Sequence, residues 1–376
     1  MANYALLAVG VGVIGILTFA VPMLLAEVFP WQLIRRQHFG RPTMTTKSYK
    51  GRTVLITGAN GAYGSRAAKL FAHRDVETLV LVDVRDCATV KEEIEKELRE
   101  SGKTVMPNIV IWQADIMTFA GCQEIGKKAR EQLKALDHVL LTAGILAFDC
   151  RQSPEGWETT IQVNFLSTAL VALLLLPLLK PSPGNPNPPV LTFVTSFGIY
   201  PAAPSMWSLP KDGGSYLKSL NNTENGMKQA QQYGMKQAQQ YGISKGLLLY
   251  FTRELAKRVS VSGDMRKVTI NSADPGSAWT PLTQPNGQML IPRLIMNFSS
   301  RDPQFGAIAL VNGASASEDA HGKILHDFDT ASYPPFMERK TGRQAQKRVW
   351  EEARKEFEAK VPEVKAVYRL LTTTRD

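Results

Sequence analysis

The 376-residue chain has only three cysteines, Cys87, Cys122 and Cys150, and none of them belongs to a Cys-x-x-Cys pair. An odd number of cysteines at irregular spacing argues against a disulfide scaffold and against a zinc ribbon. The five histidines show neither a His-Glu-x-x-His pattern nor another ligand spacing, so we expect no metal site. With 44% apolar residues, the composition is that of a globular protein.

The net charge is small over most of the chain. The formal net charge is +10, but it comes from residues 27–52 and 337–376, and the body between them is nearly neutral. A nucleic-acid-binding protein needs basic residues clustered on its folded face, so we expect no nucleic-acid partner. A neutral body with basic ends is typical instead of a protein held beside an anionic membrane surface.

Residues 1–26 carry no charged side chain, and Tyr4–Ala26 forms an apolar stretch of 23 residues. A helix of that length spans about 34 Å, which is enough for a hydrocarbon core of about 30 Å. The stretch lacks the basic start and the cleavage site of a signal peptide, and a buried helix rarely runs so long without a polar face. We therefore predict a transmembrane anchor at residues 1–28 and a basic juxtamembrane linker at residues 29–50.

The charges around this anchor predict its orientation. All nearby Lys and Arg residues follow the apolar stretch, so the chain from residue 35 onward should be cytosolic. We therefore predict a single-pass membrane protein of the endoplasmic reticulum whose folded body faces the cytosol.

From residue 53 onward, short β-branched runs alternate with helical patterns. This alternation predicts an α/β fold with one doubly wound parallel sheet of the Rossmann type, which we assign to residues 51–333. Strands are expected at residues 54–57, 78–84, 108–115, 138–144, 190–196, 268–274 and 323–328. Helices are expected near residues 62–73, 88–101, 118–135, 154–180, 236–259 and 303–313.

Two segments stand outside this alternation. Residues 201–240 have no strong period and are interpreted as an insertion, in which the sequence GMKQAQQY at 226–233 is repeated at 234–241. Two copies do not make a solenoid, so we interpret the repeat as a duplication that lengthens a loop or a helix start. In the C-terminal segment, residues 334–376, apolar side chains at four-residue steps predict an amphipathic helix. Docking of this helix on the folded body is favoured over membrane contact, and its apolar positions are Val349, Ala353, Phe357 and Val361.

The octapeptide TGANGAYG at residues 57–64 follows an expected strand and opens an expected helix. Glycines in this position permit a tight turn and a close approach of the backbone to a pyrophosphate, which a helix N-terminus stabilises. This context predicts a dinucleotide site that includes Gly58, Asn60, Gly61 and Gly64.

Asp83 ends the next expected strand, nineteen residues after Gly64. A carboxylate there can accept hydrogen bonds from both ribose hydroxyls and repels a 2′-phosphate, which favours NAD. Arg85 follows two positions later and could instead bind that phosphate. The cofactor is therefore NAD or NADP, with NAD slightly favoured.

Tyr241 and Lys245 are spaced to lie on one face of a helix that leads into an expected strand. A nearby ammonium favours phenolate and lowers a tyrosine pKa that is ordinarily about 10. We therefore expect Tyr241 to act as an acid or base near neutral pH. The repeat offers Tyr233 as an alternative, but its +4 residue is Gln237, so we reject it.

These motifs resemble, in order, those of the short-chain dehydrogenase/reductase family, and the resemblance covers about residues 50–330. The layout is similar to that of membrane-anchored retinol-dehydrogenase-like members and of fungal secondary-metabolite members. TGANGAYG matches the family's TGxxx[AG]xG, and residues 241–245 match YxxxK. The sequence PGSAWT at residues 275–280 matches PGxxxT.

The resemblance implies roles for further residues. Ser196 would hydrogen-bond the substrate oxygen, Asn164 would hold a water in a proton relay, and Lys245 would also hold the nicotinamide ribose. The catalytic residues are then Asn164, Ser196, Tyr241 and Lys245. The implied cofactor contacts are Gly58, Asn60, Gly61, Gly64, Asp83, Asp115, Ala143, Gly144, Asn164, Tyr241, Lys245, Pro275, Gly276 and Thr280.

Two positions depart from the family pattern. Thr142 stands where an asparagine is usual, which is expected to loosen the turn on the adenine side. Ser196 and Tyr241 are 45 positions apart, which is farther than the family norm. Because the chain between these two residues usually borders the substrate, the sequence defines the substrate poorly.

The resemblance implies hydride transfer between a nicotinamide and an alcohol or carbonyl carbon. An anchored enzyme suits a lipophilic substrate, such as a sterol-, terpenoid-, polyketide- or retinoid-like compound, and a role in secondary metabolism. The alternatives are a catalytically silent nucleotide-binding scaffold and an epimerase or dehydratase of the same family with bound NAD. A homodimer through the helices that contain Asn164 and Tyr241 is a further expectation.

Overall fold

A computed structural model of the chain describes Arg35, Gln37 and residues 39–147, 151–180, 187–206, 209–210, 212–221, 235–263, 265, 267–282, 300–327 and 329–372. The predicted anchor at residues 1–28 and the first copy of the repeat at residues 226–233 lie outside the described residues.

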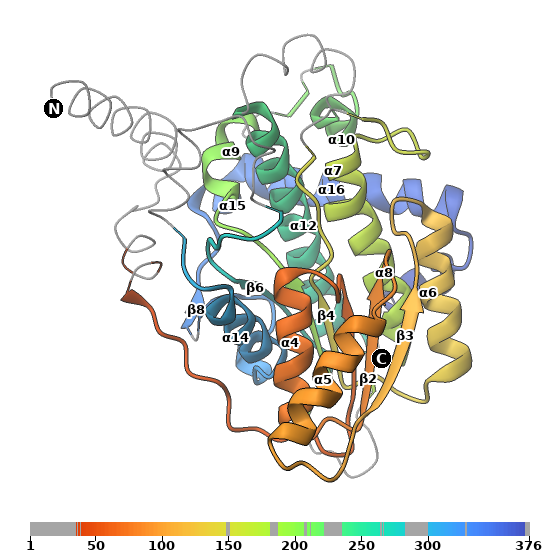
Figure 1. The fold of residues 1–376 in the computed structure, drawn as a ribbon. Helices are drawn as coiled ribbons and strands as arrows, with labels where there is room; N and C mark the ends of the chain where they lie inside the picture. The colour runs from red at the N-terminus through yellow and green to blue at the C-terminus, as the bar shows by residue number, and fades with distance from the viewer. Residues whose placement is uncertain are drawn as a thin grey trace, which may run out of the picture.

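An eight-stranded sheet, counted over the described residues, forms the middle layer of the protein (Figure 1). Its strand order is β3-β2-β1-β4-β5-β6-β7-β8. The strands are β1 Thr53–Thr57, β2 Thr78–Asp83, β3 Asn108–Gln113, β4 His138–Leu141, β5 Val190–Val194, β6 Thr269–Asp274, β7 Ile324–His326 and β8 Asp329–Ala331. The expected parallel sheet is confirmed for β1 to β7. The expectation misses β8, a polar strand antiparallel to β7 that carries no apolar run.

Helices cover both faces of the sheet (Figure 1). One apolar core lies under α4, α5 and α14, and the other lies under α6, α8, α12 and α16. Alternate strand residues enter the two cores: Val54 and Ile56 of β1 point to the first, and Leu55 points to the second. The helices are α4 Ala62–His73, α5 Ala88–Glu100, α6 Phe119–Gln132, α7 Thr159–Ile161, η2 Gln162–Ser167, α8 Thr168–Leu175, η3 Leu176–Leu178, α9 Ile199–Met206, α10 Tyr216–Leu220, α12 Met235–Val261, α14 Pro303–Ala314, η4 Glu318–Ala320, α15 Pro335–Glu338, α16 Lys340–Lys360 and α17 Val364–Leu370.

The continuous helical segment Thr159–Leu178 is mostly apolar and almost wholly buried. Within the described part of the chain it is the one helix long and apolar enough to cross a membrane, but 89% of its apolar window is buried inside the protein. A helix that is apolar all round is expected in the centre of a large core. We therefore describe it as the core helix beside β4 and β5.

The C-terminal segment docks on the folded body, as the sequence favours. Val349, Ala353, Phe357 and Val361 are all buried. Between them, Trp350 stacks on Phe251 of α12, with ring centroids 5.0 Å apart and an interplanar angle of 23°. In Figure 1, α16 crosses behind α12.

The segment at residues 201–240 contains more regular structure than its sequence pattern predicts. Helix α9 ends inside it at Met206, α10 lies within it, and α12 begins at Met235 in the second repeat copy. Helix α10 has only five residues, too few for a periodic pattern, and Ser215 caps it by accepting a hydrogen bond from the backbone N–H of Lys218.

Candidate active site

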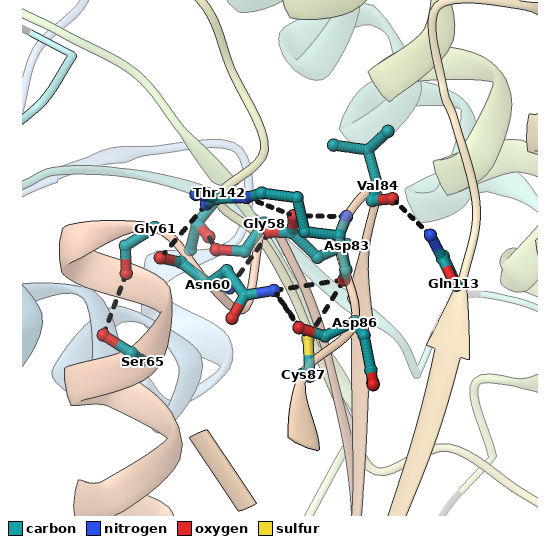
Figure 2. Close-up of polar contacts among 11 residues, drawn as sticks. Gly58, Asn60, Gly61, Ser65, Asp83, Val84, Asp86, Cys87, Gln113 and Thr142 are labelled. Atoms are coloured by element: carbon teal, nitrogen blue, oxygen red, sulfur yellow. Dashed lines mark hydrogen bonds and ion pairs between the residues drawn. The ribbon is translucent and has the colours of Figure 1, made fainter. Parts of the chain in front are cut away.

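The glycine-rich turn joins β1 to α4 and packs tightly against the loop after β4 (Figure 2). Gly58 has φ +69°, and a side chain on it would lie 2.8 Å from the backbone of Ala143. A side chain on Gly64 would lie 2.1 Å from the carbonyl oxygen of Gly58. Only glycine fits at these two positions, so the turn has the tight shape that the sequence predicts.

The N-terminus of α4 is open to an anion. Gly61 is its N-cap, no side chain caps the helix, and its first turn contains no acidic residue. The first N–H groups of a helix carry a partial positive charge, and a pyrophosphate would satisfy them. The predicted dinucleotide therefore fits the residues present here.

Asn60 ties the glycine-rich turn to the loop after β2 (Figure 2). Its side-chain nitrogen lies 3.1 Å from the carbonyl oxygen of Arg85, 2.9 Å from that of Asp86 and 3.3 Å from the sulfur of Cys87. These bonds use the side-chain nitrogen of Asn60, so this side chain shapes the adenosine side of the predicted site.

Thr142 tightens the turn that it was expected to loosen. Its hydroxyl donates to the carbonyl oxygen of Thr57, and the backbone N–H of Ala143 lies 3.3 Å from the hydroxyl oxygen of Thr57. The expected loosening is therefore wrong, because a threonine hydroxyl reaches the strand end and fastens β4 to the turn after β1.

Asp83 closes β2, and only 8% of it is exposed. One carboxylate oxygen accepts from the backbone N–H of Asn60 at 3.0 Å, and the other accepts from that of Arg85 at 3.1 Å. Each oxygen has a further lone pair, so both can still accept from ribose hydroxyls. The exposed Arg85 guanidinium lies 3.5 Å from the carboxylate. The side chain that could bind a 2′-phosphate therefore lies beside the one that could bind the ribose hydroxyls.

Asp115 follows β3 at the same edge of the sheet as Asp83. It is exposed, and its carboxylate accepts from the backbone N–H of Met117 at 2.8 Å. The neighbouring Gln113 donates to the carbonyl oxygen of Val84 at 3.0 Å, which holds the two strand ends together (Figure 2). The structure thus places Asp115 beside the adenosine end of the predicted site.

Ser196 and Tyr241 meet although they are 45 positions apart in the sequence. The Tyr241 side chain hydrogen-bonds the Ser196 side chain. The Ser196 hydroxyl oxygen also accepts from the backbone N–H of Gly198 at 3.1 Å. A side chain on Gly198 would lie 3.3 Å from the Ser196 hydroxyl and 3.6 Å from the Tyr241 ring. Gly198 therefore keeps open the space beside this pair.

Lys245 is buried and links α12 to the sheet. Its ammonium donates to the carbonyl oxygen of Val194 at 2.8 Å and lies 5.9 Å from the centre of the Tyr241 ring. A side chain on Gly144 would lie 3.6 Å from the same ammonium. The pair Tyr241–Lys245 thus lies beside the loop after β4, as a nicotinamide site requires.

Burial dominates the proton affinities of this pair. It raises the pKa of Tyr241 to about 12, against the opposing effect of the Ser196 hydrogen bond. Burial also lowers the pKa of Lys245 to about 8, which the nearby Asp274 carboxylate partly offsets. The expected lowering of the Tyr241 pKa is therefore wrong, because burial outweighs the groups that favour the phenolate. At neutral pH the phenol holds its proton.

Asn164 lies in the π-helical turn η2, and π-turns occur frequently at functional sites. Its side-chain oxygen accepts from the backbone N–H of Ile145 at 2.7 Å. Its nitrogen donates to the carbonyl oxygen of Ile145 at 2.9 Å and to the hydroxyl of Ser244 at 3.1 Å. Asn164 therefore joins the loop after β4 to the catalytic helix, and its water-holding role stays a prediction.

The loop at residues 275–280 is held from several sides. Gly276 has φ +71°, and its backbone N–H donates to Asp274 at 2.9 Å. The buried guanidinium of Arg301 donates twice to the carbonyl oxygen of Pro275, at 3.1 and 2.6 Å. Gln37 bonds both the N–H and the carbonyl of Ser277.

Sequence reasoning does not identify three of these supports, namely Asp274, Arg301 and Gln37. Asp274 carries a signal, because an acidic residue ends β6 directly before the Pro-Gly pair. Its pKa is lowered although burial opposes this, because His326, the backbone N–H of Gly276 and Arg301 stabilise the carboxylate. Arg301 and Gln37 carry no local pattern that points to them.

All these groups belong to the carboxyl edge of the parallel strands. The glycine-rich turn follows β1, the residues 142–144 follow β4, Ser196 follows β5, and Pro275 follows β6. Thr280, the last member of the predicted set, is buried in the same loop region. In open α/β sheets, ligands bind at this edge, where strand order changes direction. The predicted residues are thus brought to one site.

Comparisons with known proteins agree with this geometry. A family model described as short chain dehydrogenase matches residues 52–186. The short chain dehydrogenase resG of Aspergillus sclerotiorum is 30% identical over 338 residues, which are 86% of this chain and 89% of that protein. The short-chain dehydrogenase/reductase phmF of Phaeosphaeria nodorum is 28% identical over 312 residues, covering 82% of this chain and 86% of that one.

A solved structure shows the same fold. The crystal structure of an uncharacterized protein from Mycobacterium paratuberculosis superposes with a TM-score of 0.57 at 19% identity. The match covers 84% of this chain and 97% of the other. At that identity the likeness establishes the architecture of the sheet and its helices.

Proposed function

Since the chain belongs to the short-chain dehydrogenase/reductase family, we propose that it interconverts an alcohol and a ketone or aldehyde with NAD(H) or NADP(H). The observation that carries this proposal is the meeting of Ser196, Tyr241 and Lys245 beside the loop after β4. A proton donor, a hydrogen-bond donor and a cation beside one dinucleotide site are what carbonyl reduction requires.

The chain's own residues would act as follows. Tyr241 holds its proton at neutral pH and would donate it to the carbonyl oxygen, to which Ser196 would also hydrogen-bond. Lys245 would turn from Val194 toward the nicotinamide ribose and stabilise the phenolate left after proton transfer. When bound, the nicotinamide supplies or accepts the hydride.

The substrate belongs, in this proposal, to lipophilic alcohols and ketones of sterol-, terpenoid-, polyketide- or retinoid-like chemistry, and the enzyme acts in secondary metabolism. The apolar N-terminal stretch supports this, because substrates that partition into bilayers are reached best from a membrane surface. Fungal relatives that align with more than four fifths of this chain support a role in fungal metabolism.

The proposal places the protein at the endoplasmic reticulum, anchored by residues 1–28, with its body in the cytosol. The linker supports a fixed orientation, because it packs along α14 rather than hanging free (Figure 1). The backbone N–H of Thr45 donates to Asn312 at 2.9 Å, and Asn312 donates to the carbonyl oxygen of Thr43 at 3.0 Å. Lys47 donates to the carbonyl oxygen of Ser315 at 2.7 Å.

The glycosylation state tests this topology. The sequence contains the sequons Asn221-Asn222-Thr223 and Asn297-Phe298-Ser299. A cytosolic body leaves both unmodified, so treatment with a deglycosylating enzyme should not change the electrophoretic mobility. A shift in mobility would place the body in the lumen and overturn the orientation.

A homodimer through the helices that contain Asn164 and Tyr241 belongs to the same proposal. Within one chain, α16 already packs on α12, and α17 packs on α8. A second copy would therefore have to use the remaining faces of these helices. Sedimentation velocity of the detergent-solubilised protein distinguishes a dimer from a monomer.

A cofactor titration followed by a substrate screen tests the activity. We expect NADH or NADPH to quench tryptophan fluorescence on binding, and a lipid extract then to change the nicotinamide absorbance. Binding without turnover of any alcohol or ketone would favour the silent scaffold. Product formation without net cofactor consumption would favour an epimerase or dehydratase.

A further inference from the structure

The C-terminal helix α16 holds the short helix α10 through one carboxylate. Glu352 accepts from the Ser215 hydroxyl at 2.6 Å and from the backbone N–H groups of Tyr216 and Leu217 at 3.0 and 2.9 Å. Arg348, one turn earlier, donates to Glu352 at 3.2 Å and to the carbonyl oxygen of Gly214. A carboxylate bonded to the first N–H groups of a helix is a charge-assisted cap.

From α10 the contacts continue to α9. Tyr216 is fully buried, and its hydroxyl donates to the carbonyl oxygen of Met206, the last residue of α9, at 3.0 Å. Helix α9 starts at Ile199, three residues after Ser196. Helix α9, which follows the predicted catalytic serine, is therefore held at its C-terminal end by α10.

Helix α9 in turn leaves no free space against the catalytic helix α12. A side chain on Gly242 would lie 2.6 Å from the Ala202 side chain and 2.3 Å from the Gly198 carbonyl oxygen. A side chain on Gly246 would lie 2.6 Å from the Met206 sulfur. These two glycines directly follow Tyr241 and Lys245, so the position of α9 sets the surroundings of both catalytic side chains.

We propose that Glu352 is a positioning residue for the substrate side of the site. By capping α10 it holds Tyr216 and Met206, and through them it seats α9 against α12 beside Tyr241. The C-terminal helix thereby determines the wall that the substrate meets, whereas the glycine-rich turn and its cofactor contacts lie outside this chain of contacts. The inference rests on the proposed function only for what the wall binds.

Hydrogen–deuterium exchange of the full-length, ligand-free protein tests the brace without any substrate. In E352A we expect the amides of α9 and α10 to exchange about tenfold faster, because a charge-assisted cap is lost. In E352Q the increase should be smaller, since one amide oxygen can still accept. Glu358→Gln is the matched control, because Glu358 pairs with Arg354 at 2.7 Å within α16 itself. Unchanged exchange of α9 and α10 in both E352A and E352Q overturns the proposal.

Kinetics then test the link to the substrate. For an alcohol or ketone that the wild type converts, E352Q should raise KM about tenfold and leave kcat and the cofactor Kd within about twofold. An equal fall in kcat and in cofactor affinity would point to a general structural role and contradict the proposal. If the wild type converts nothing, the exchange result still decides the brace, and the failure belongs to the proposed function alone.

Discussion

The two halves of the site are held together in different ways. On the adenosine side, Asn60 and Asp83 bond to partners 2 to 27 positions away in the sequence. On the proposed substrate side, the partners of Glu352 at the start of α10 are 135 to 137 positions away, and Gln346 donates to Glu254 over 92 positions. The bonds between β1, β2 and their turns are thus local, although Thr142 also reaches Thr57 from the end of β4, 85 positions away. The proposed substrate side is braced by the C-terminal segment.

We expect this difference to separate the residues that hold the cofactor from the residues that select the substrate. A local unit keeps its shape when distant parts of the chain change, because its bonds close short loops. A wall held by a distant helix can change with that helix while the catalytic groups stay in place. We therefore expect variants on the two sides to separate into effects on cofactor and effects on substrate.

Tyr241→Phe should have the largest effect on turnover, because it removes the proposed proton donor between the two sides of the site. Removing the phenolic proton donor should lower kcat about 10³-fold, equivalent to about 4 kcal/mol of transition-state stabilisation. The cofactor Kd should change only about twofold, because the variant loses the hydroxyl of one implied cofactor contact and keeps Lys245 and the turn after β1. Steady-state kinetics and a fluorescence titration measure the two quantities. A variant with full activity would mean that Tyr241 is not the proton donor.

Trp350→Ala tests how much of the fold depends on the C-terminal segment. Trp350 is buried, stacks on Phe251, packs edge-on against Tyr368 and lies under the Arg258 guanidinium. Truncating such a side chain should lower the free energy of unfolding by about 3 kcal/mol. Urea unfolding measures the loss, and Phe39→Ala, at an exposed aromatic position, is the control. Equal midpoints for the two variants would mean that α16 adds little to stability.

The sequence predicts the turn after β1 and Asp83 because their signals are contiguous, whereas it misses Arg301 and Gln37, which hold the loop at residues 275–280. Residues 57–64 form one turn, and Asp83 ends the strand beside it, so spacing alone brings them together. Ser196, Tyr241 and Lys245 are identified by the family pattern, and the structure confirms that they meet.

The sequence cannot predict the substrate-side brace. The partners of Glu352 include backbone N–H groups, which any residue supplies, on a helix too short to show a period. The pKa of Tyr241 is missed for a similar reason: burial is a property of the folded environment, and it outweighs a lysine that the spacing places nearby.

A pH titration of stability probes the opposite edge of the sheet, away from the site. Burial lowers the pKa of His138, at the start of β4, to about 4, and Arg52 adds to this. As pH falls below about 6.5, His138 is protonated in the unfolded chain but stays neutral in the native state. The free energy of unfolding should therefore fall by about 2 kcal/mol by pH 5.

His138→Gln should remove that part of the acid dependence, and urea midpoints at pH 7 and pH 5 measure it. His73→Gln, at a partly exposed histidine 3.8 Å from Glu97, is the matched control. If His138→Gln also keeps the wild-type slope, the histidine is not buried in its neutral form. At each pH, His138→Gln should have the same activity per folded molecule as the wild type, because His138 lies at the amino end of β4.

Asp83→Ser should have the smallest effect, and that effect should be confined to the adenosine side of the site. Removing the carboxylate lifts its repulsion of a 2′-phosphate and frees the Arg85 guanidinium 3.5 Å away. We expect the ratio of NADPH to NADH affinity to rise about tenfold, equivalent to about 1.4 kcal/mol. Asp83→Ser combined with Arg85→Ala should lose most of that increase in NADPH preference, while KM for the carbonyl substrate stays constant. A change in substrate KM would show that the two sides of the site are coupled after all.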